Sequence, residues 1–181
     1  MNILGISGSL RSGSYNTRLL YTAMELLPSG TVLTLADCAA IPLYNKDLDA
    51  ADKPPAVLAL SRAISAADGL LIATPEYNHS FSGVLKNTID WVSRPASRSV
   101  LANKPTAIVS AAKGHVGGAR AQAHLRQVLA STLTPVLNAP PLLVPAAQEK
   151  FPAEGPASDP ETRRRLERYL LDFVDWLHRL A

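Results

Sequence analysis

The sequence predicts an α/β fold in which a parallel sheet is covered by helices on both faces. Five short apolar segments alternate along the chain with five longer segments that have the 3.6-residue periodicity of amphipathic helices. The third apolar segment, residues 68–75, is apolar on both faces, as expected of a strand inside a parallel sheet. This alternation favours a parallel sheet, because parallel strands need crossover connections that are usually helical.

The predicted strands are short apolar runs that end at glycine, proline or polar residues. They are residues 2–7, 30–36, 68–75, 105–112 and, more weakly, 134–139. The proline-rich residues 138–160 are interpreted as a connector to the last helix. Ligands of such sheets bind at the carboxyl ends of the strands, so we expect the chemistry in the loops after the first, third and fourth strands.

The predicted helices have one apolar face and recognisable ends. They are residues 16–27, 54–67, 83–94, 118–132 and a last helix with Ser158 and Asp159 as candidate caps, Pro160 in its first turn and Glu161 completing a capping box. The third should stop before Pro95. The last has an apolar stripe of Leu166, Tyr169, Leu170, Phe173, Val174 and Leu177. Its arginines, Arg163, Arg164, Arg165 and Arg168, are interpreted as a solvated face.

The composition describes an ordinary globular protein and excludes several function classes. The 181 residues predict a single domain spanning residues 1–181. The net charge of +3 gives little support for nucleic-acid binding. No apolar run reaches the roughly 18 residues of a membrane span, and no signal-peptide pattern is found, so we expect no membrane insertion and a cytoplasmic location. Cys38 is the only cysteine, which excludes a disulfide within one chain.

The loop after the first strand, with the sequence GSLRSGSYN at residues 8–16, has the chemistry of a phosphate site. Ser9, Ser12 and Ser14 offer hydroxyl donors, and Arg11 can form a charge-assisted pair with an oxyanion. Asn16 is expected to cap the helix that follows, whose N-terminal N–H groups and dipole favour an anion. The alternative interpretation is a polar turn without a ligand.

Two common phosphate loops do not match this segment. A P-loop has lysine after its second glycine, but Ser14 follows Gly13 here. A dinucleotide fingerprint needs the spacing G-x-G-x-x-G, whereas the glycines are Gly5, Gly8 and Gly13. What remains is a loop for a terminal monophosphate, as in a mononucleotide.

The loops after the third and fourth strands can hold a flat heteroaromatic ring between them. The first offers Tyr77 and Phe81 as apolar surfaces, although each alone is equally explained as a packing residue. The second contains Gly114, Gly117 and Gly118, which allow the backbone to approach a ligand closely.

Three motifs together, GSLRSGSYN, PEYNHSFSGVLKNTIDWVSRP and GHVGGARAQAHLRQVL, resemble the NADPH-dependent FMN reductase family, and more closely its quinone and chromate reductase branch. The similarity extends from residue 1 to about residue 142 in order and spacing and includes IPLYNKDLD at residues 41–49. It implies a flavodoxin-like three-layer sandwich with strand order 2-1-3-4-5 and a bound FMN.

The resemblance also implies which residues bind the cofactor. They are Ser9, Arg11, Ser14 and Asn16 at the phosphate, Pro75, Glu76, Tyr77 and Asn78 along the isoalloxazine edge, Ser110 and Gly114 in the loop on the other side of the ring, and in addition Tyr15 and Lys113. Lys113 departs from the family, in which a small or apolar residue is usual; it is expected near the flavin or the nicotinamide phosphate. Arg94, Arg98 and Arg120 are candidates for the 2′-phosphate of NADPH, and the sequence does not choose among them.

The implied activity is ping-pong hydride transfer from NADPH or NADH through FMN to a quinone, free flavin, azo dye or chromate. It requires no catalytic nucleophile or acid–base pair, and the four histidines show no metal-ligand spacing. Relatives imply a homodimer or homotetramer, with the DWVSR and ARAQ helices as interface candidates. Two alternatives stay open: a flavodoxin-type electron carrier, although those are usually acidic and this pI is about 9.2, and a non-enzymatic flavin- or nucleotide-sensing module.

Overall fold

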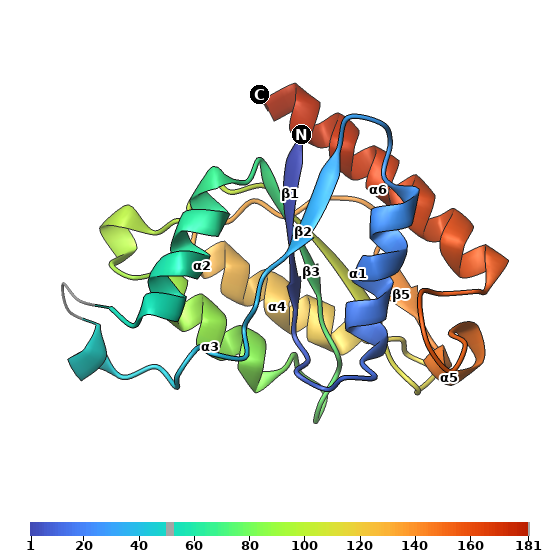
Figure 1. Ribbon diagram of the computed structural model, residues 1–181, viewed down its shortest axis with the longest axis horizontal. Coiled ribbons are helices and arrows are strands. Elements are labelled where there is room, and N and C mark those ends of the chain that lie inside the picture. The colour runs from blue at the N-terminus through green and yellow to red at the C-terminus, as the bar shows by residue number, and fades with distance from the viewer. Residues whose placement is uncertain (50–52, 181) are drawn as a thin grey trace.

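The computed structural model describes residues 1–49 and 53–180, and a five-stranded parallel sheet forms its centre (Figure 1). The strands are β1 (Asn2–Ser7), β2 (Val32–Leu35), β3 (Gly69–Ala73), β4 (Thr106–Ala111) and β5 (Leu142–Val144). Their order in the sheet is β2-β1-β3-β4-β5, which confirms the expected topology. The first four lie within their predicted segments.

Helices cover both faces of this sheet. The long helices are α1 (Tyr15–Leu26), α2 (Pro55–Ala66), α3 (Gly83–Val92), α4 (Ala119–Ser131) and α6 (Pro160–Leu180); the short ones are α5 (Ala147–Lys150) and the 3₁₀ turns η1 (Lys46–Leu48) and η2 (Ala96–Arg98). On β3, Leu71 and Ala73 pack with α1 and α6, whereas Leu70 and Ile72 pack with α2, α3 and α4. The run that is apolar on both faces therefore lies where it was predicted, between two cores.

The prediction of the fifth strand at residues 134–139 is wrong. That segment touches the sheet at a single bridge, in which Val136 lies beside Thr106. Strand β5 begins at Leu142, which pairs with Val109. The chain between these two points bulges away from β4 and contains Pro140 and Pro141, which have no N–H to donate to a ladder.

A side chain from α6 fills the gap that this bulge leaves in the ladder. The hydroxyl of Tyr169 accepts from the N–H of Ile108 at 3.2 Å and donates to the carbonyl of Ile108 at 3.0 Å. The N–H and the carbonyl of Ile108 lie on the edge of β4 that faces β5. Strand β5 pairs with β4 only from Val109 onward and leaves these two groups uncovered. Burial raises the pKa of the Tyr169 phenol, more than its contact with Ile108 lowers it.

The proline-rich residues 138–160 lead to α6 as expected, and they also contain β5 and α5, which were not predicted there. The segment is tied to α1 by polar contacts: Arg18 donates to the carbonyls of Pro152 and Gly155, and the N–H of Ala157 donates to Thr22 Oγ1 at 2.8 Å. Buried hydrogen bonds of this kind make the segment part of the folded core.

Helix α6 begins where it was predicted, with Asp159 as its cap. The Asp159 carboxylate accepts from Thr162 N at 2.8 Å. Among the described residues no hydrogen bond joins Ser158 to Glu161, so the expected capping box is not formed; Glu161 forms an ion pair with Arg164 instead. All six residues of the predicted apolar stripe are buried.

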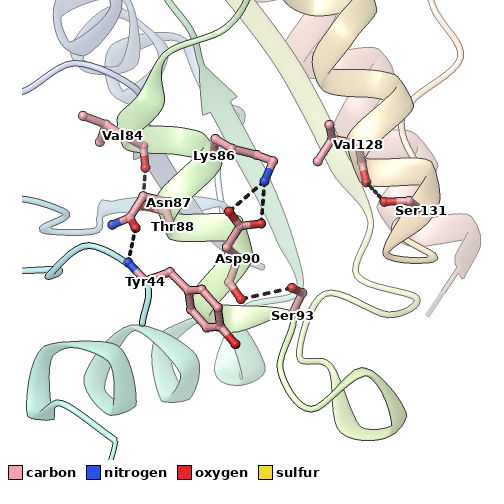
Figure 2. Close-up of polar contacts among 9 residues, drawn as sticks. All are labelled: Tyr44, Val84, Lys86, Asn87, Thr88, Asp90, Ser93, Val128 and Ser131. Atoms are coloured by element: carbon pink, nitrogen blue, oxygen red, sulfur yellow. Dashed lines mark hydrogen bonds and ion pairs between the residues drawn. The ribbon is translucent and has the colours of Figure 1, made fainter. Parts of the chain in front are cut away.

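Helix α3 anchors the segment that follows β2. The N–H of Tyr44 donates to Asn87 Oδ1 at 2.7 Å, and Asn87 Nδ2 donates to Pro42 O at 2.9 Å. Figure 2 shows the first of these contacts beside the exposed ion pair of Lys86 and Asp90. None of the helices in the described part of the chain has the length and apolarity needed to cross a bilayer.

Candidate functional site

The loops after β1, β3 and β4 meet at the carboxyl ends of the strands, at the lower edge of the view in Figure 1. They surround a cavity of about 570 Å³. Ten of the twelve residues expected at the cofactor line it: Ser9, Arg11, Ser14, Tyr15, Asn16, Pro75, Glu76, Tyr77, Lys113 and Gly114. Asn78 and Ser110 do not.

The cap of α1 is Ser14 and not Asn16, which corrects the sequence-based expectation. Ser14 is buried, and its Oγ accepts from the N–H of Thr17 at 3.3 Å. Serine and asparagine are comparable caps, so the local sequence does not distinguish between them. The choice is decided by the distant contact that Asn16 makes.

Asn16 joins α1 to the sheet. Its Nδ2 donates to the carbonyl of Ala111 at 2.9 Å, and its Oδ1 accepts from the N–H of Ala111 at the same distance. The neighbouring strand β3 has ended at Ala73, so the carboxamide provides the partner that a further strand residue would have provided. This pair holds the first turn of α1 at the floor of the cavity.

The first loop offers the donors that a phosphate needs. The N–H groups of Tyr15 and Asn16 belong to the first turn of α1 and have no acceptor among the described residues. The Arg11 side chain lies at the same end of the cavity, 5.6 Å from the centre of the Tyr15 ring. Ser9 adds a hydroxyl. An unpaired helix N-terminus beside a guanidinium fits a phosphate dianion.

The loop after β3 is a tight hairpin. Tyr77 and Ser80 exchange two backbone hydrogen bonds of 2.9 and 3.0 Å. The two residues between them, Asn78 and His79, have positive φ values of 49° and 65°, the conformation of a two-residue type I′ turn. Asn78 therefore forms the turn and does not line the cavity, whereas Tyr77 lines it and is half-exposed.

Glu76 connects this hairpin to α4. Its carboxylate accepts from the N–H groups of Arg120 at 3.1 Å and Ala121 at 3.3 Å, and it pairs with Arg120 Nε at 2.8 Å. Burial alone would raise the pKa of the Glu76 carboxyl, but the hydrogen bonds from Arg120 and Ala121 outweigh it and hold the pKa below its usual value. The carboxylate is therefore ionised and braces two walls of the cavity against each other.

The loop after β4 depends on two glycines. Gly117 and Gly118 have φ values of 63° and 92°, and a Cβ on Gly118 would lie 2.6 Å from the Cβ of Ser110. Ser110 is fully buried behind them, and its hydroxyl donates to Gly117 O at 2.7 Å. Ser110 thus supports the loop from behind, which is why it does not line the cavity.

Some lining residues were not among the expected ones. They are Ala111, Ala112, Val116, Gly117, Gly118 and Arg120. The sequence had indicated the two glycines as places where the backbone can approach a ligand, and Arg120 as a candidate for the coenzyme phosphate. The buried Arg18 behind Tyr15 was missed entirely, with its guanidinium 5.8 Å from the ring centre. Nothing in the sequence distinguishes it from a solvent-facing helix arginine.

Comparison with known proteins decides the family. A family profile described as NADPH-dependent FMN reductase matches residues 1–149. The chain belongs to the NADPH-dependent FMN reductase family. Membership assigns it to the NAD(P)H-dependent oxidoreductases that use FMN, and the flavodoxin-like fold agrees with the observed strand order.

Members of this family are similar to the chain over nearly its whole length. An NAD(P)H-dependent FMN reductase of Pseudomonas aeruginosa is 48% identical, covering 99% of this chain and 97% of the relative. A 2-hydroxy-1,4-benzoquinone reductase of a Burkholderia species is 38% identical over 98% of this chain and 96% of its own. The solved flavoenzyme FerB, an NAD(P)H:(acceptor) oxidoreductase from Paracoccus denitrificans, superposes with a TM-score of 0.90 at 34% identity, covering 98% and 97% of the two chains.

The cavity fits the cofactor that the family implies. FMN combines a phosphate dianion with a flat tricyclic ring. The donors of the first loop suit the former, and the space between the hairpin of residues 77–80 and the glycine loop suits the latter. No cluster of three or more His, Cys, Asp or Glu side chains within residues 1–49 and 53–180 is arranged to hold a metal ion.

Proposed function

We propose that this chain is a single FMN-binding domain that transfers a hydride equivalent from NADPH or NADH to a quinone. The observation that carries the proposal is the cavity itself, which joins an anion cradle at one end to an open, partly apolar mouth at the other. Bound FMN supplies the hydride chemistry, and the protein supplies binding and orientation.

The residues of the three loops divide the binding work. Arg11 and Ser9, with the N–H groups at the start of α1, hold the phosphate. Pro75 and Tyr77 bound one side of the ring site, and Gly114 with its loop bounds the other. None of these groups is needed to donate or remove a proton during hydride transfer.

Donor and acceptor are proposed to use the same mouth in turn, which gives ping-pong kinetics. The mouth is half-open and carries the exposed side chains of Tyr77 and Val116, which suit a planar, partly apolar molecule. Two relatives of 38% identity are named for quinone reduction, which favours a quinone over free flavin, an azo dye or chromate. These names also argue against the electron-carrier and sensing alternatives.

We further propose a cytoplasmic homodimer or homotetramer. A cleft of about 320 Å³ runs between α3 and α4 and is lined in part by Val128 and Leu133, of which Leu133 is 71% exposed. The proposal of an oligomer rests on the resemblance to the family, and this cleft is the surface of α3 and α4 that we propose a second subunit covers.

The test is to load the purified protein with FMN and measure steady-state rates with NADPH or NADH against a benzoquinone, FMN, an azo dye and chromate. We expect a flavin absorption spectrum, the highest kcat/KM with the benzoquinone, and parallel double-reciprocal lines. A protein that takes up no FMN, or that holds FMN and oxidises neither coenzyme, contradicts the proposal.

A further inference from the structure

The cavity carries more positive charge than FMN requires. Arg11, Lys113 and Arg120 line it, and Glu76 is the one acidic residue among the described residues that do so. Arg11 belongs to the phosphate loop at the far end, where the free N–H groups of α1 already favour an anion. Lys113 and Arg120 remain, both from the side of the cavity formed by the loop after β4 and the start of α4.

The structure discriminates among the three arginines that the sequence proposed for a coenzyme phosphate. Arg94 lines the separate cleft between α3 and α4, where its guanidinium lies 5.7 Å from the centre of the Tyr44 ring. Arg98 lies in η2 and does not line the cavity. Arg120 does line it.

Arg120 is oriented by Glu76. Its Nε donates to Glu76 Oε1 at 2.8 Å, while the Glu76 carboxylate is itself held by the first N–H groups of α4. The glutamate side chain is 10% exposed and that of Arg120 is 48% exposed. The two terminal nitrogens of the guanidinium have no partner among the described residues, so a pair of parallel donors is left for an oxyanion.

Lys113 adds a second charge without a competing partner. Its side chain is exposed, and no hydrogen bond or ion pair engages it within the described part of the chain. Lys113 and the terminal nitrogens of Arg120 therefore place two cationic groups without internal partners on the lining of one cavity, which favours an anion there. A dianion satisfies both groups better than a monoanion does.

We propose that Arg120 and Lys113 form the receptor for the 2′-phosphate of NADPH and that Glu76 is a positioning residue for Arg120. This inference rests on the proposed function, because it concerns the coenzyme of that same site. NADH lacks the 2′-phosphate, so the pair selects NADPH. The pyrophosphate, which both coenzymes share, is the competing ligand of the same chemistry.

The experiment compares kcat/KM for NADPH and NADH in the FMN-loaded protein, with one benzoquinone as acceptor. For Arg120→Met we expect the NADPH-to-NADH ratio to fall roughly 10- to 100-fold, the range of a hydrogen bond to a charged group. Lys113→Met should lower the ratio less, by at most about 5-fold, the range of an exposed ion pair. Arg120→Lys, which keeps the charge and loses the paired donors, lies between the wild type and Arg120→Met.

Two further variants test whether the coenzyme preference depends on the oriented Arg120 side chain rather than on the overall charge of the protein or on its folding. Arg98→Met removes the same charge outside the cavity and is expected to leave the ratio unchanged. Glu76→Gln removes no contact to the coenzyme, yet it is expected to lower the ratio by about 3- to 10-fold because Arg120 loses its orientation. A merely structural role for Glu76 would reduce both coenzymes equally and leave the ratio as it was.

A binding measurement provides the second readout. By calorimetry, FMN-loaded wild type should bind adenosine 2′,5′-bisphosphate more tightly than 5′-AMP, and Arg120→Met should lose the difference. Equal losses with NADPH and NADH, or no preference for the bisphosphate, overturn the inference and favour the pyrophosphate. If no coenzyme is oxidised with any acceptor, the proposed function fails, and calorimetry alone then supports or overturns the receptor.

Discussion

The side-chain amide of Asn16 pairs with the backbone of Ala111 through two hydrogen bonds, each 2.9 Å long. The pair fixes the N-terminal turn of α1 against the end of β4, and these two elements carry two of the three loops around the cavity. This contact therefore links the loop that carries the phosphate donors to the strand that leads into the glycine loop. Asn16 is 3% exposed, so water cannot replace the amide if it is lost.

Replacing Asn16 with aspartate tests this contact. The new side chain is nearly isosteric, but a carboxylate oxygen would face the carbonyl of Ala111 where an N–H now donates. We expect the free energy of unfolding in urea to fall by about 1–3 kcal/mol and FMN to dissociate more readily. The exposed Asn138→Asp is the matched control for the added charge. Equal stability of the two variants would show that the amide pair is dispensable.

Tyr169→Phe tests the hydroxyl that replaces a strand beside β4. The change leaves the N–H and the carbonyl of Ile108 without a partner inside the protein, which we expect to cost about 1–3 kcal/mol. Hydrogen exchange of the Ile108 amide should accelerate. FMN affinity should not change, because Tyr169 does not line the cavity.

The control for this variant is Tyr21→Phe, whose side chain is 44% exposed. It removes the same hydroxyl from a place where water remains available. If Tyr169→Phe were as stable as this control, the two contacts to Ile108 would make no net contribution to folding.

The layers follow from information that is local in the sequence, whereas the strand order was predicted from the resemblance to a family. Apolar runs and helical periodicity locate β1 to β4 and the long helices to within a few residues, and the two-sided apolar run at β3 identifies a central strand. The position of β5 is different. Residues 134–139 contain Val136 and Leu137 but also two polar residues, and the chain makes only one bridge there before it passes Pro140 and Pro141 and pairs with β4 from Leu142.

Sequence motifs located residues on the cavity lining, but they did not show the roles that depend on a distant partner. Arg11 and Ser9 line it because the loop that contains them follows β1 directly. The local sequence allows Asn16 as a cap, and only Ala111, which lies far along the chain, assigns it another role. Ser110 likewise acts through its hydrogen bond to the carbonyl of Gly117, and no local sequence pattern predicts that contact.

Arg11→Ala combined with Ser9→Ala tests the phosphate cradle. The substitutions remove the guanidinium and a hydroxyl from the end of the cavity where the first N–H groups of α1 are free. We expect FMN affinity, followed by flavin fluorescence, to fall at least about tenfold, since a hydrogen bond to a charged group contributes roughly 1.5–3 kcal/mol.

Ser12→Ala is the control for this prediction, because Ser12 lies in the same loop but does not line the cavity. It should bind FMN as the wild type does. If the double variant retained wild-type affinity, the phosphate of FMN would have to be held elsewhere, and the placement of the cofactor would be wrong.

Asp159 makes the start of α6 sensitive to pH. Hydrogen bonds from the hydroxyl and the N–H of Thr162 stabilise its carboxylate and, against some burial, hold the pKa below its usual value. A carboxyl with a lowered folded pKa stabilises the native state above its unfolded pKa of about 3.9, and this contribution is lost as the pH falls through the folded pKa.

Asp159→Ala should therefore cost about 0.5–2 kcal/mol at pH 7, measured by urea unfolding, and less below pH 4. Asp175→Asn, on an exposed part of α6, is the control for losing a carboxylate from the same helix and should leave the free energy of unfolding at pH 7 unchanged. A cost for Asp159→Ala that stayed constant from pH 7 to pH 2.5 would mean that the charge of the cap contributes nothing and that its shape alone matters.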